Sequence, residues 1–570
     1  MTTDHKAQMP INAFADKTLS WEQIMTPEKL SEDQRAWKTK TARFVEEEVR
    51  PVLPQIENQQ FDPVYGLMKN LGSMGLLGAF IPAEHGGTAI DKVAYTAVIE
   101  EMGGARSFSV SYGAQVGIGS LPIVYYGTEK QKASYLPKIA AGDMIGSYGL
   151  TEPGAGTDIA AVQTTAEASE DESVYTISGE KQWITNSSFA SYFIIFAKID
   201  GKKPTAFIVD RNTEGFTVGK EEDKMGITGS STCPLYLDNV KVPKEAIVGE
   251  IGKGARIALS ILNLGRQKIA ASCVGASKRA LLLAAEHAQE RRQFGHPLSE
   301  KKMIQKKLAA MAVWTFASES MVYRTAGVLQ AGTEAAEKAG IPFADILKDF
   351  AIECSINKIF ASEALSDIVD HGVQVHGGQG YMRKNEIETL YRDSRINRIF
   401  EGTNEINRVV VASMLFEMAE KLAAEKVTES YEKNGLDKEK SYMEKLRELL
   451  AELVQETSGV FETPEEEQEL LECVAETAKT VYVMESVWSR VQKDQSPGEL
   501  MIKMAVVYMN EAVDRILPML KEAADFLESD SMLQKVKQLA ADKAAETDQS
   551  IVYRRKIAEA VIEQNGYPLS

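Results

Sequence analysis

The 570-residue sequence lacks an excess of basic residues. It has 64 Lys and Arg against 82 Asp and Glu, which gives a formal net charge of −18. Residues 421–570 hold 19 basic and 30 acidic residues, so this last quarter contributes 19 − 30 = −11. A protein that binds nucleic acid needs a basic surface to neutralise phosphates. Nucleic acid is therefore not an expected partner.

Cysteine and histidine are also scarce. The four cysteines lie far apart and form no CxxC pair, so the sequence predicts buried free thiols without a disulfide framework. Among the six histidines, His371 and His376 stand five apart, which does not place two metal ligands on one helical face. No metal site is expected.

Long apolar runs are absent as well. No stretch approaches the roughly 20 apolar residues that a helix needs to cross a bilayer. The start, "MTTDHKAQMPINAF", shows no charged segment followed by an apolar one, as a secretory signal would. A cytoplasmic location is the resulting expectation.

The chain divides into blocks of different pattern. Residues 148–252 contain short strand-like runs such as "YFIIFAKI" and "TAFIVD", separated by turn signals without long helices between them. The other blocks read as amphipathic helices, and Ser31 is placed to cap the run that follows it. The prediction is an α+β multidomain protein with a helical domain at 1–147, an antiparallel β domain at 148–252, and helical domains at 253–422 and 423–570.

Two stretches of the β block could hold a ligand. In "YGLTEPGAGTD" (148–158), closely spaced glycines allow a ligand to approach the backbone, although an ordinary turn is the alternative. The loop lacks the third glycine of a dinucleotide fingerprint. In "KQWITNS" (181–187), Trp183 and Thr185 offer a flat apolar face and a hydroxyl to a planar ring, and the alternative is a buried strand tryptophan.

Arginines and adjacent glycines mark two further stretches in the helical part. Arg266 in "NLGRQ" and Arg291 in "ERRQFGHPL" could bind phosphate, or could equally face solvent or pair with an acid. The glycines of "QVHGGQGY" (374–381) could expose amides to an anion, or simply form a turn between helices.

Glu401 is the last candidate, in "RINRIFEGTNEINR" (395–408). It follows the apolar pair Ile399 and Phe400 and precedes Gly402. A carboxylate in a mostly apolar cleft has a raised pKa, which suits a base working near neutral pH. The alternative is an exposed charge paired with Arg398 or Arg408.

These five stretches, with "LYLDNVKVPKEAIVG", occur in an order that resembles the acyl-CoA dehydrogenase family over residues 35–415. The versions "LNLGR" and "RIFEGTNEI", with about 150 further C-terminal residues, look most like the very-long-chain type. The resemblance implies an N-terminal helical domain, a middle β-barrel or sandwich domain and a C-terminal four-helix bundle, with FAD between the last two. The extra C-terminal helices would form a fourth domain.

The resemblance also implies roles for individual residues. Trp183 would pack on the flavin ring, Thr185 would bond near its N5, and Arg291 would hold the FAD diphosphate with 374–378 of a neighbouring subunit. The implied FAD contacts are Tyr148, Leu150, Thr151, Gly156, Thr157, Trp183, Ile184, Thr185, Arg291, Phe294, Gln374, Val375, His376, Gly377, Gly378, Thr403, Asn404 and Glu405. The implied acyl-CoA contacts are Gly113, Ala114, Thr157, Asn263, Leu264, Gly265, Arg266 and Gly402.

Glu401 falls on the position of the family's catalytic base. It would remove the α-proton of a thioester while the β-hydrogen leaves as hydride to the flavin, and its own backbone amide would stabilise the enolate-like oxygen. One branch of the family places the base just before the substrate-binding arginine. Here that position is Gly265, which leaves Glu401 as the candidate. The implied electron acceptor is electron-transfer flavoprotein.

Three positions bear on how far the resemblance extends. Lys301 and Lys302 stand where many members have Phe-Gln near the FAD, so those contacts are not expected here. Phe400 replaces a common tyrosine, as in the very-long-chain branch. Ala114, beside Gly113, falls where a larger residue ends the medium-chain acyl pocket, so small side chains predict a deeper pocket and long-chain substrates.

The additional C-terminal helices suggest a homodimer, because a similar extension replaces half of a tetramer in the related long form. Their acidic balance argues against strong attraction to anionic lipid, so membrane contact is expected to be peripheral at most. Two rival functions remain: an acyl-CoA oxidase that passes electrons to oxygen, and a non-catalytic assembly protein. Fast flavin reoxidation by air would indicate the first, and a colourless protein the second.

Overall fold

The structure is a computed structural model, which describes residues 24–419, 435–461, 466–494, 497–545 and 549–569. The chain start that bears on location and the predicted domain boundary at 422/423 lie outside these residues. The chain forms two compact units. Unit 1 comprises Met1–Leu30, Ile269–Ala335 and Asp349–Ser570, and unit 2 comprises Ser31–Lys268 and Ala336–Lys348.

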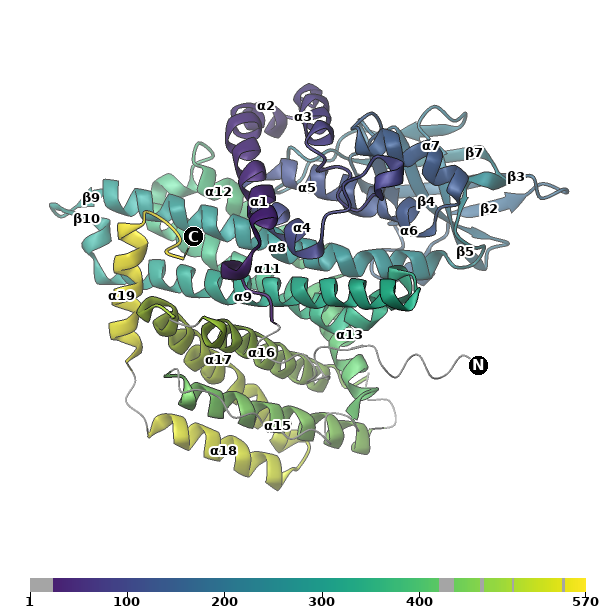
Figure 1. The fold of residues 1–570 in the computed structure, drawn as a ribbon. Coiled ribbons are helices and arrows are strands. Elements are labelled where there is room, and N and C mark those ends of the chain that lie inside the picture. Colours follow the sequence, from purple (N-terminus) through teal and green to yellow (C-terminus); the bar gives the residue numbers. More distant parts are fainter. Residues whose placement is uncertain (1–23, 420–434, 462–465, 495–496, 546–548, 570) are drawn as a thin grey trace. The chain divides into compact units, whose positions relative to one another are not determined.

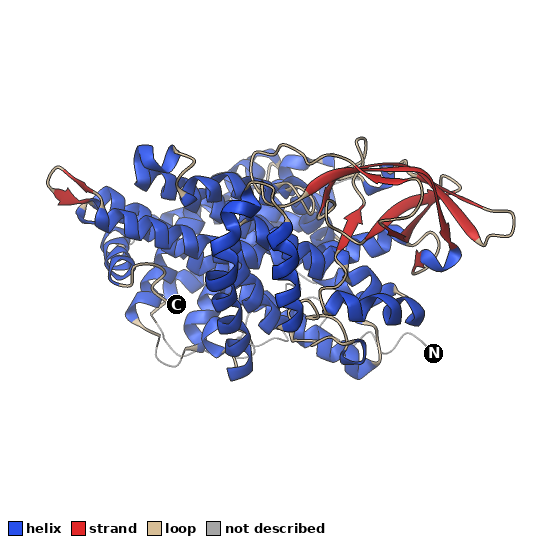
Figure 2. Ribbon diagram, turned by 90° about the horizontal axis from the view of Figure 1, so that it is seen from above, coloured by secondary structure: helices blue, strands red, loops and turns tan. Residues whose placement is uncertain are grey.

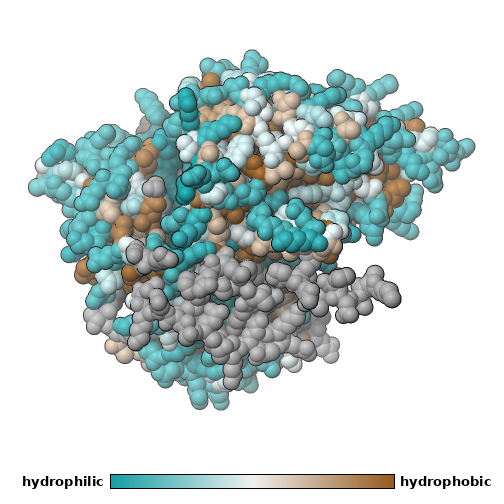
Figure 3. Space-filling model, viewed as in Figure 1, coloured by the Kyte–Doolittle hydropathy of each residue, from teal (hydrophilic) through white to brown (hydrophobic). Residues whose placement is uncertain are grey.

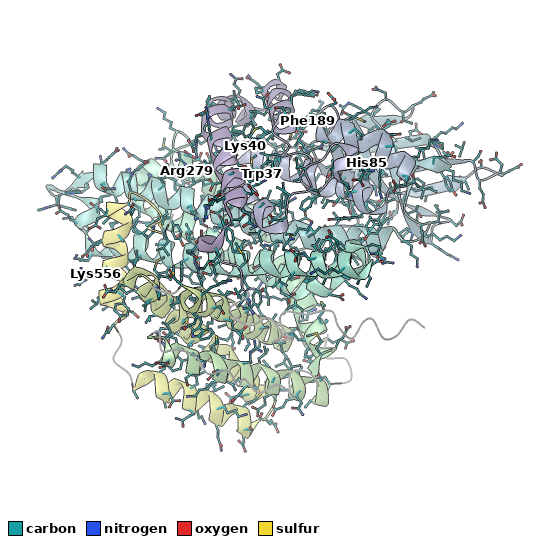
Figure 4. All side chains as sticks on the ribbon, in the orientation of Figure 1. Trp37, Lys40, His85, Phe189, Arg279 and Lys556 are labelled. Carbon is teal, nitrogen blue, oxygen red and sulfur yellow. The ribbon has the colours of Figure 1, made fainter. Side chains whose placement is uncertain are left out.

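Unit 2 begins with the predicted helical domain. Ser31 caps helix α1 (Glu32–Phe44) in a capping box: its hydroxyl accepts from the Gln34 amide at 3.2 Å, and Gln34 returns a bond to the Ser31 amide at 2.9 Å. On α1, the Lys40 ammonium lies 5.2 Å from the ring centre of Trp37 (Figure 4). The helices that follow are α2 (Leu53–Glu57), α3 (Asp62–Ser73), α4 (Lys92–Met102), α5 (Ser107–Ala114), α6 (Leu121–Tyr126) and α7 (Glu129–Ala140).

The β domain of unit 2 is one sheet, drawn in red in Figure 2. Its strands are β1 (Gly146–Gly149), β2 (Thr165–Ala168), β3 (Val174–Thr185), β4 (Tyr192–Ile199), β5 (Lys203–Asp210), β6 (Phe216–Val218), β7 (Thr232–Pro243) and β8 (Ile247–Val248). The order is β6-β7-β3-β2-β4-β5-β8, with β1 against β4. The pairing is antiparallel as predicted, apart from β1 with β4 and β2 with β4, which are parallel.

One face of this sheet is apolar, and its core includes Tyr175, Phe193, Phe207 and Leu235, each at most 2% exposed. Burial of large apolar side chains from several strands is the main contribution that stabilises such a sheet. It gives the loops at the strand ends a fixed scaffold.

Helix α8 (Gly254–Glu290) leaves unit 2 at Lys268 and continues in unit 1. The helices of unit 1 that follow it are α9 (Lys302–Ala339, up to Ala335), α11 (Ala351–His376), α12 (Glu386–Ser394) and α13 (Asn404–Phe416), and a small hairpin of β9 (Arg292–Gln293) and β10 (His296–Pro297) follows α8. The short α10 (Phe343–Ile346) belongs to unit 2. Arg279 on α8, which Figure 4 labels, forms a two-point ion pair with Glu386 at the start of α12.

The remaining helices of unit 1 form the C-terminal module, which we define as residues 435–569. They are α15 (Asp437–Val460), α16 (Gln468–Lys493), α17 (Glu499–Phe526), α18 (Asp530–Ala544) and α19 (Ser550–Glu563). Figure 1 shows α15, α16 and α17 running alongside one another, and α16 packs on α13, α15 and α17. The Arg490 guanidinium of α16, only 1% exposed, pairs with Glu28 and Glu319.

The outer surface of the C-terminal module bears on the predicted membrane contact. Figure 3 shows mainly hydrophilic residues where α18 is visible, on the one face that it draws. Within the described residues, no helix combines the length and the apolar character that crossing a membrane requires.

Candidate functional site

The two segments of unit 2 predicted to hold the flavin lie side by side. The Gln182 amide donates to the Thr151 carbonyl at 2.9 Å, and the Ser147 hydroxyl donates to the Thr185 carbonyl. Between them, Glu152 and Ala155 exchange backbone hydrogen bonds and close a tight turn around Pro153 and Gly154. The glycine loop is therefore a turn that is fixed against the tryptophan strand, a geometry that is compatible with a ligand-binding loop and with an ordinary turn.

A buried ion pair lies beneath this loop. Lys181 is 0% exposed and its ammonium donates to Glu152 at 2.6 Å and to the Phe196 carbonyl at 2.6 Å. Glu152 also accepts from the amides of Gln163 and Thr164. Burial lowers the pKa of Lys181 to about 8. The pair locks the loop to the sheet, a role that the sequence analysis missed although Lys181 stands within the motif.

Trp183 projects from the sheet instead of packing inside it. Its side chain is 59% exposed and its φ is +60°. The register of β3 against β7 shifts between Lys181 and Ile184, which marks a bulge at this point. Bulges re-aim side chains, and a non-glycine residue in the left-handed region stores strain that clusters at functional sites. The alternative of a buried strand tryptophan is therefore wrong.

The glycines of the loop leave room for a ligand. A Cβ added to Gly154 or Gly156 would meet nothing within 4 Å. Neither glycine has a positive φ, so the backbone conformation does not require glycine, and the open space is what a side chain would fill. With the exposed Trp183 ring and the half-buried Thr185, unit 2 presents a flat apolar surface and an open stretch of backbone that suit a planar ring.

The arginine predicted to contact substrate is buried in α8. Arg266 is 5% exposed and its guanidinium donates to the Asn263 side chain at 2.9 Å. Asn263 in turn donates to the Leu347 carbonyl at 3.2 Å. The reading of Arg266 as a solvated charge is therefore wrong, and the side chain is held in a fixed orientation within unit 2.

Gly113, which is predicted to line the acyl pocket, lies against the side chain of Lys268. A Cβ at this position would lie 3.2 Å from Cδ of Lys268, whose ammonium donates to the Gly113 carbonyl at 2.8 Å. The free side of Gly113 thus accommodates Lys268. Ala114, the other residue of the predicted acyl pocket, is 5% exposed on the same helix.

In unit 1, two predicted segments meet through stacked histidines. The His287 and His376 rings lie 4.3 Å apart at 23°, which joins the last turn of α8 to the end of α11. Burial lowers the pKa of His287 to about 4. Arg291 is exposed just beyond His287, and Gln374, Gly377 and Gly378 are exposed around His376.

This end of unit 1 is open toward solvent and exposes both charged and aromatic side chains. A Cβ at Gly377 or Gly378 would meet nothing within 4 Å, and Gly377 has a φ of +59° that favours glycine. Phe294, at the tip of the β9–β10 hairpin, is 92% exposed with a φ of +54°. An exposed guanidinium and an exposed ring are groups that bind a diphosphate and an aromatic base, and the two glycines leave space for a ligand beside the backbone.

Glu401 lies on a short loop between the turn Arg395–Arg398 and helix α13. Its φ is +54° and that of Gly402 is +83°, so two successive residues adopt the left-handed region. Thr403 caps α13 by accepting from the Ile406 amide at 3.3 Å. Trp183, Phe294 and Glu401 thus share a backbone conformation that is uncommon for residues other than glycine.

The loop is anchored by a buried lysine that the sequence analysis did not identify. Lys358 on α11 is 0% exposed and donates to the Gly402 carbonyl at 2.8 Å and to Asn404 Oδ1 at 2.7 Å. Asn404 is itself 2% exposed and donates to Glu363 at 3.0 Å. Thr403 and Asn404 therefore use their side chains to hold the loop, whereas the side chain of Glu405 is exposed.

Arg408, one of the two arginines considered as alternative partners of Glu401, pairs with acids on two other helices. Arg408 donates to Glu363 at 2.7 Å and to Glu476 at 2.8 Å. Burial alone would raise the pKa of Glu363, but Lys479 and Arg408 lower it to about 2. Arg408 is thus fixed in a network of charges on α11, α13 and α16.

Comparison with known proteins gives matches to four domain families along the chain. The models describe the acyl-CoA dehydrogenase N-terminal domain over residues 31–143, the middle domain over 147–240, and two C-terminal domains over 252–416 and 458–540. A probable acyl-CoA dehydrogenase of Bacillus subtilis (strain 168) is 41% identical over 575 residues, or 96% of each chain. The very long-chain specific enzyme of Rattus norvegicus mitochondria is 40% identical over 65% of this chain and 56% of its own.

Solved structures give a similar result. An acyl-CoA dehydrogenase from Bacillus anthracis, complexed with FAD, superimposes with a TM-score of 0.92 at 39% identity, covering 97% of this chain and 99% of that one. Butyryl-CoA dehydrogenase from Megasphaera elsdenii superimposes with a TM-score of 0.61 at 34% identity, covering 68% of this chain and 99% of its own.

Proposed function

The chain belongs to the acyl-CoA dehydrogenase family, and from that premise we propose that it oxidises acyl-CoA thioesters to trans-2-enoyl-CoA with FAD in fatty acid β-oxidation. The observation that carries the proposal is Glu401 itself, a carboxylate held at a strained φ of +54° by a loop that buried side chains anchor. A residue held in this way is preorganised for chemistry, which a solvated surface charge is not.

The residues around the glycine loop fit a flavin. Trp183 supplies a ring face, Thr185 supplies a hydroxyl, and the backbone beside Gly156 is open to approach. Bound there, FAD would supply the redox chemistry by accepting the β-hydrogen as a hydride. The contribution of unit 2 is to orient the ring and to exclude water from one side of it.

Glu401 would take the α-proton of the thioester. Removing this proton develops negative charge on the thioester carbonyl oxygen, which the Glu401 backbone amide can stabilise. Gly402 supports this assignment, because it adds no side chain between a thioester and that amide. Base and hydrogen-bond donor then belong to one residue, and the anchored loop aligns them together.

We assign Arg266 and Asn263 to binding of the acyl-CoA, because their mutual hydrogen bond fixes both side chains. Ala114 is assigned to the end of the acyl chamber, and its small side chain supports a preference for long chains. Gly113 supports this preference less than the sequence alone suggested, since Lys268 fills the space beside it.

We propose that the protein is a homodimer in the cytoplasm and that electron-transfer flavoprotein reoxidises its flavin. The support for a homodimer comes from helix α11 and from exposed side chains of unit 1. Lys358 and His376 stand 18 residues apart on α11, or about 27 Å at 1.5 Å per residue. The 374–378 segment is therefore far from the Glu401 loop of its own subunit, which supports a role at the FAD of a second copy. The exposure of Phe294, Tyr381 and Met303 at 92%, 86% and 82% supports an interface in unit 1.

A series of acyl-CoA thioesters of increasing chain length, assayed with an artificial electron acceptor, tests the proposed function. The wild type should form the enoyl product, with the highest kcat/KM for long chains. Glu401→Gln should lose about 100-fold or more of kcat, the usual contribution of a general base. Glu417→Gln, which changes an exposed acid directly after the last residue of α13, is the matched control. Retained turnover in Glu401→Gln would remove the assigned base.

A further inference from the structure

The C-terminal module contacts the same ion-pair network that anchors the Glu401 loop. The network starts at the Gly402 carbonyl and at Asn404, both of which accept from the ammonium of Lys358. Asn404 also donates its amide to Glu363, one turn beyond Lys358 on α11. Two helical turns of α11 thus fix the backbone immediately after the base.

Glu363 connects these anchors to charged groups on two other helices. It accepts from Arg408 on α13 at 2.7 Å and from Lys479 on α16 at 3.2 Å. Its low pKa of about 2 reflects these cations acting against the cost of burial. The carboxylate is therefore ionised at neutral pH and holds both helices to α11.

Helix α16 adds a second carboxylate on the opposite side of the same two cations. Glu476 accepts from Arg408 at 2.8 Å and from Lys479 at 2.8 Å. The side chains of Arg408, Lys479 and Glu476 are only 13%, 12% and 16% exposed. Screening by water is weak at such exposure, and cations shared between two carboxylates restrict one another more than an isolated surface pair would.

We propose that Glu476 and Lys479 are positioning residues for the catalytic loop, and that one function of the C-terminal module is to hold Glu401 in register through them. This inference rests on the proposed role of Glu401 as the base. Helix α13 begins directly after the loop, so Arg408, one turn into α13, transmits the restraint from α16. A displacement of about 1 Å at a reacting group can cost up to 100-fold in rate.

The test is the charge-neutral double variant Glu476→Ala/Lys479→Ala in the full-length, FAD-loaded protein. It removes the two α16 side chains that lie closest to Glu363 and Arg408, and it leaves Lys358, Glu363, Arg408 and the longer 3.7 Å contact between Arg408 and the exposed Glu472 of α16 in place. We expect kcat to fall about 10-fold, with KM for acyl-CoA and FAD content unchanged, because the loop is displaced but the binding groups are not. The primary isotope effect with α-deuterated substrate should rise. Amide exchange in residues 398–408 should become faster.

The control removes an ion pair of the same module that lies away from α11 and α13. Lys535 on α18 and Glu452 on α15 pair at 2.7 Å, and the double variant Glu452→Ala/Lys535→Ala should keep wild-type kcat and loop exchange. Lys479→Arg, which keeps the charge and donors, should retain most of the activity. If the double alanine variant does not fold, Glu476→Gln takes its place, since it removes only the charge.

The inference is overturned if the α16 variant keeps kcat within two-fold of wild type and leaves exchange in 398–408 unchanged. It is equally overturned if the Glu452→Ala/Lys535→Ala control loses as much activity. Failure of the proposed function would look different: wild type would show no acyl-CoA oxidation, or Glu401→Gln would retain turnover. Even then, the exchange measurement reports whether α16 holds the loop.

Discussion

The ammonium of Lys358 lies 2.8 Å from the carbonyl oxygen of Gly402, the residue that follows Glu401. A fully buried lysine is costly unless it is satisfied, and here it also donates to Asn404. The hydrogen bonds of this cation fix the backbone of a loop whose left-handed conformation is unfavourable at Glu401, whereas Gly402 adopts it without strain.

Replacing Lys358 with methionine should therefore loosen the loop. Methionine fills much of the same volume but removes the donor to the buried Asn404 Oδ1, which costs about 1–3 kcal/mol, and leaves the Gly402 carbonyl with the hydrogen bond from the Asn407 side chain at 2.9 Å. We expect lower thermal stability and a larger loss of kcat than of acyl-CoA binding, measured by unfolding and by steady-state kinetics. Lys306→Met, an exposed lysine on α9, is the control. Unchanged kcat in a folded Lys358→Met protein would contradict the anchoring role.

The lowered pKa of Glu363 predicts how the free energy of unfolding changes at acidic pH. Because the folded protein lowers its pKa from 4.5 to about 2, the folded state favours the ionised form. This stabilisation is fully present above pH 4.5 and is lost as the pH falls toward 2. The difference in free energy of unfolding between wild type and Glu363→Gln should thus be about 2 kcal/mol smaller at pH 3 than at pH 6. Urea unfolding at both pH values checks this, and a difference independent of pH would refute it.

Trp183 should matter for flavin binding more than for folding. Its side chain is 59% exposed, so Trp183→Ala removes only the buried minority of the tryptophan surface and should destabilise flavin-free protein by less than the about 3–5 kcal/mol that truncation of a core tryptophan costs. Its φ of +60° favours glycine, so Trp183→Gly should be more stable than Trp183→Ala by about 1 kcal/mol. Both variants should retain less FAD after dialysis. Full flavin retention would argue against the assigned ring contact.

A substitution at Ala114 tests the proposed preference for long acyl chains. A glutamate there would place a larger, charged side chain at the predicted end of the acyl chamber, where Ala114 is 5% exposed. Ala114→Glu should reduce kcat/KM for long chains at least 10-fold and affect short chains less, because unpaired burial of a charge is costly. The profile across chain lengths is the measurement. Undiminished long-chain activity would show that the chamber ends elsewhere.

The sequence predicted those structural features that depend only on residues close together in the chain. The capping box at Ser31 and the strand runs of the β block formed as expected, because each depends on residues within a few positions. Motif order predicted the family for a similar reason, since the glycine loop, "WIT" and "FEGTNEI" are each contiguous.

Interactions between distant residues were not predictable in the same way. Glu363 and Lys479 are 116 positions apart, and no local pattern marks them as partners. Trp183 was ambiguous because strand residues alternate between faces, and only the bulge against β7 decides that it points outward. The contact between Gly113 and Lys268 was not predictable either, because the two residues are 155 positions apart.

The most direct test of the account is anaerobic mixing of FAD-loaded protein with one equivalent of long-chain acyl-CoA, followed by flavin absorbance. Wild type and Glu417→Gln should lose the absorbance of oxidised flavin rapidly. Glu401→Gln should bind the thioester but reduce its flavin at least about 100-fold more slowly. Flavin reduction at the wild-type rate in Glu401→Gln would contradict the assignment of Glu401 as the base.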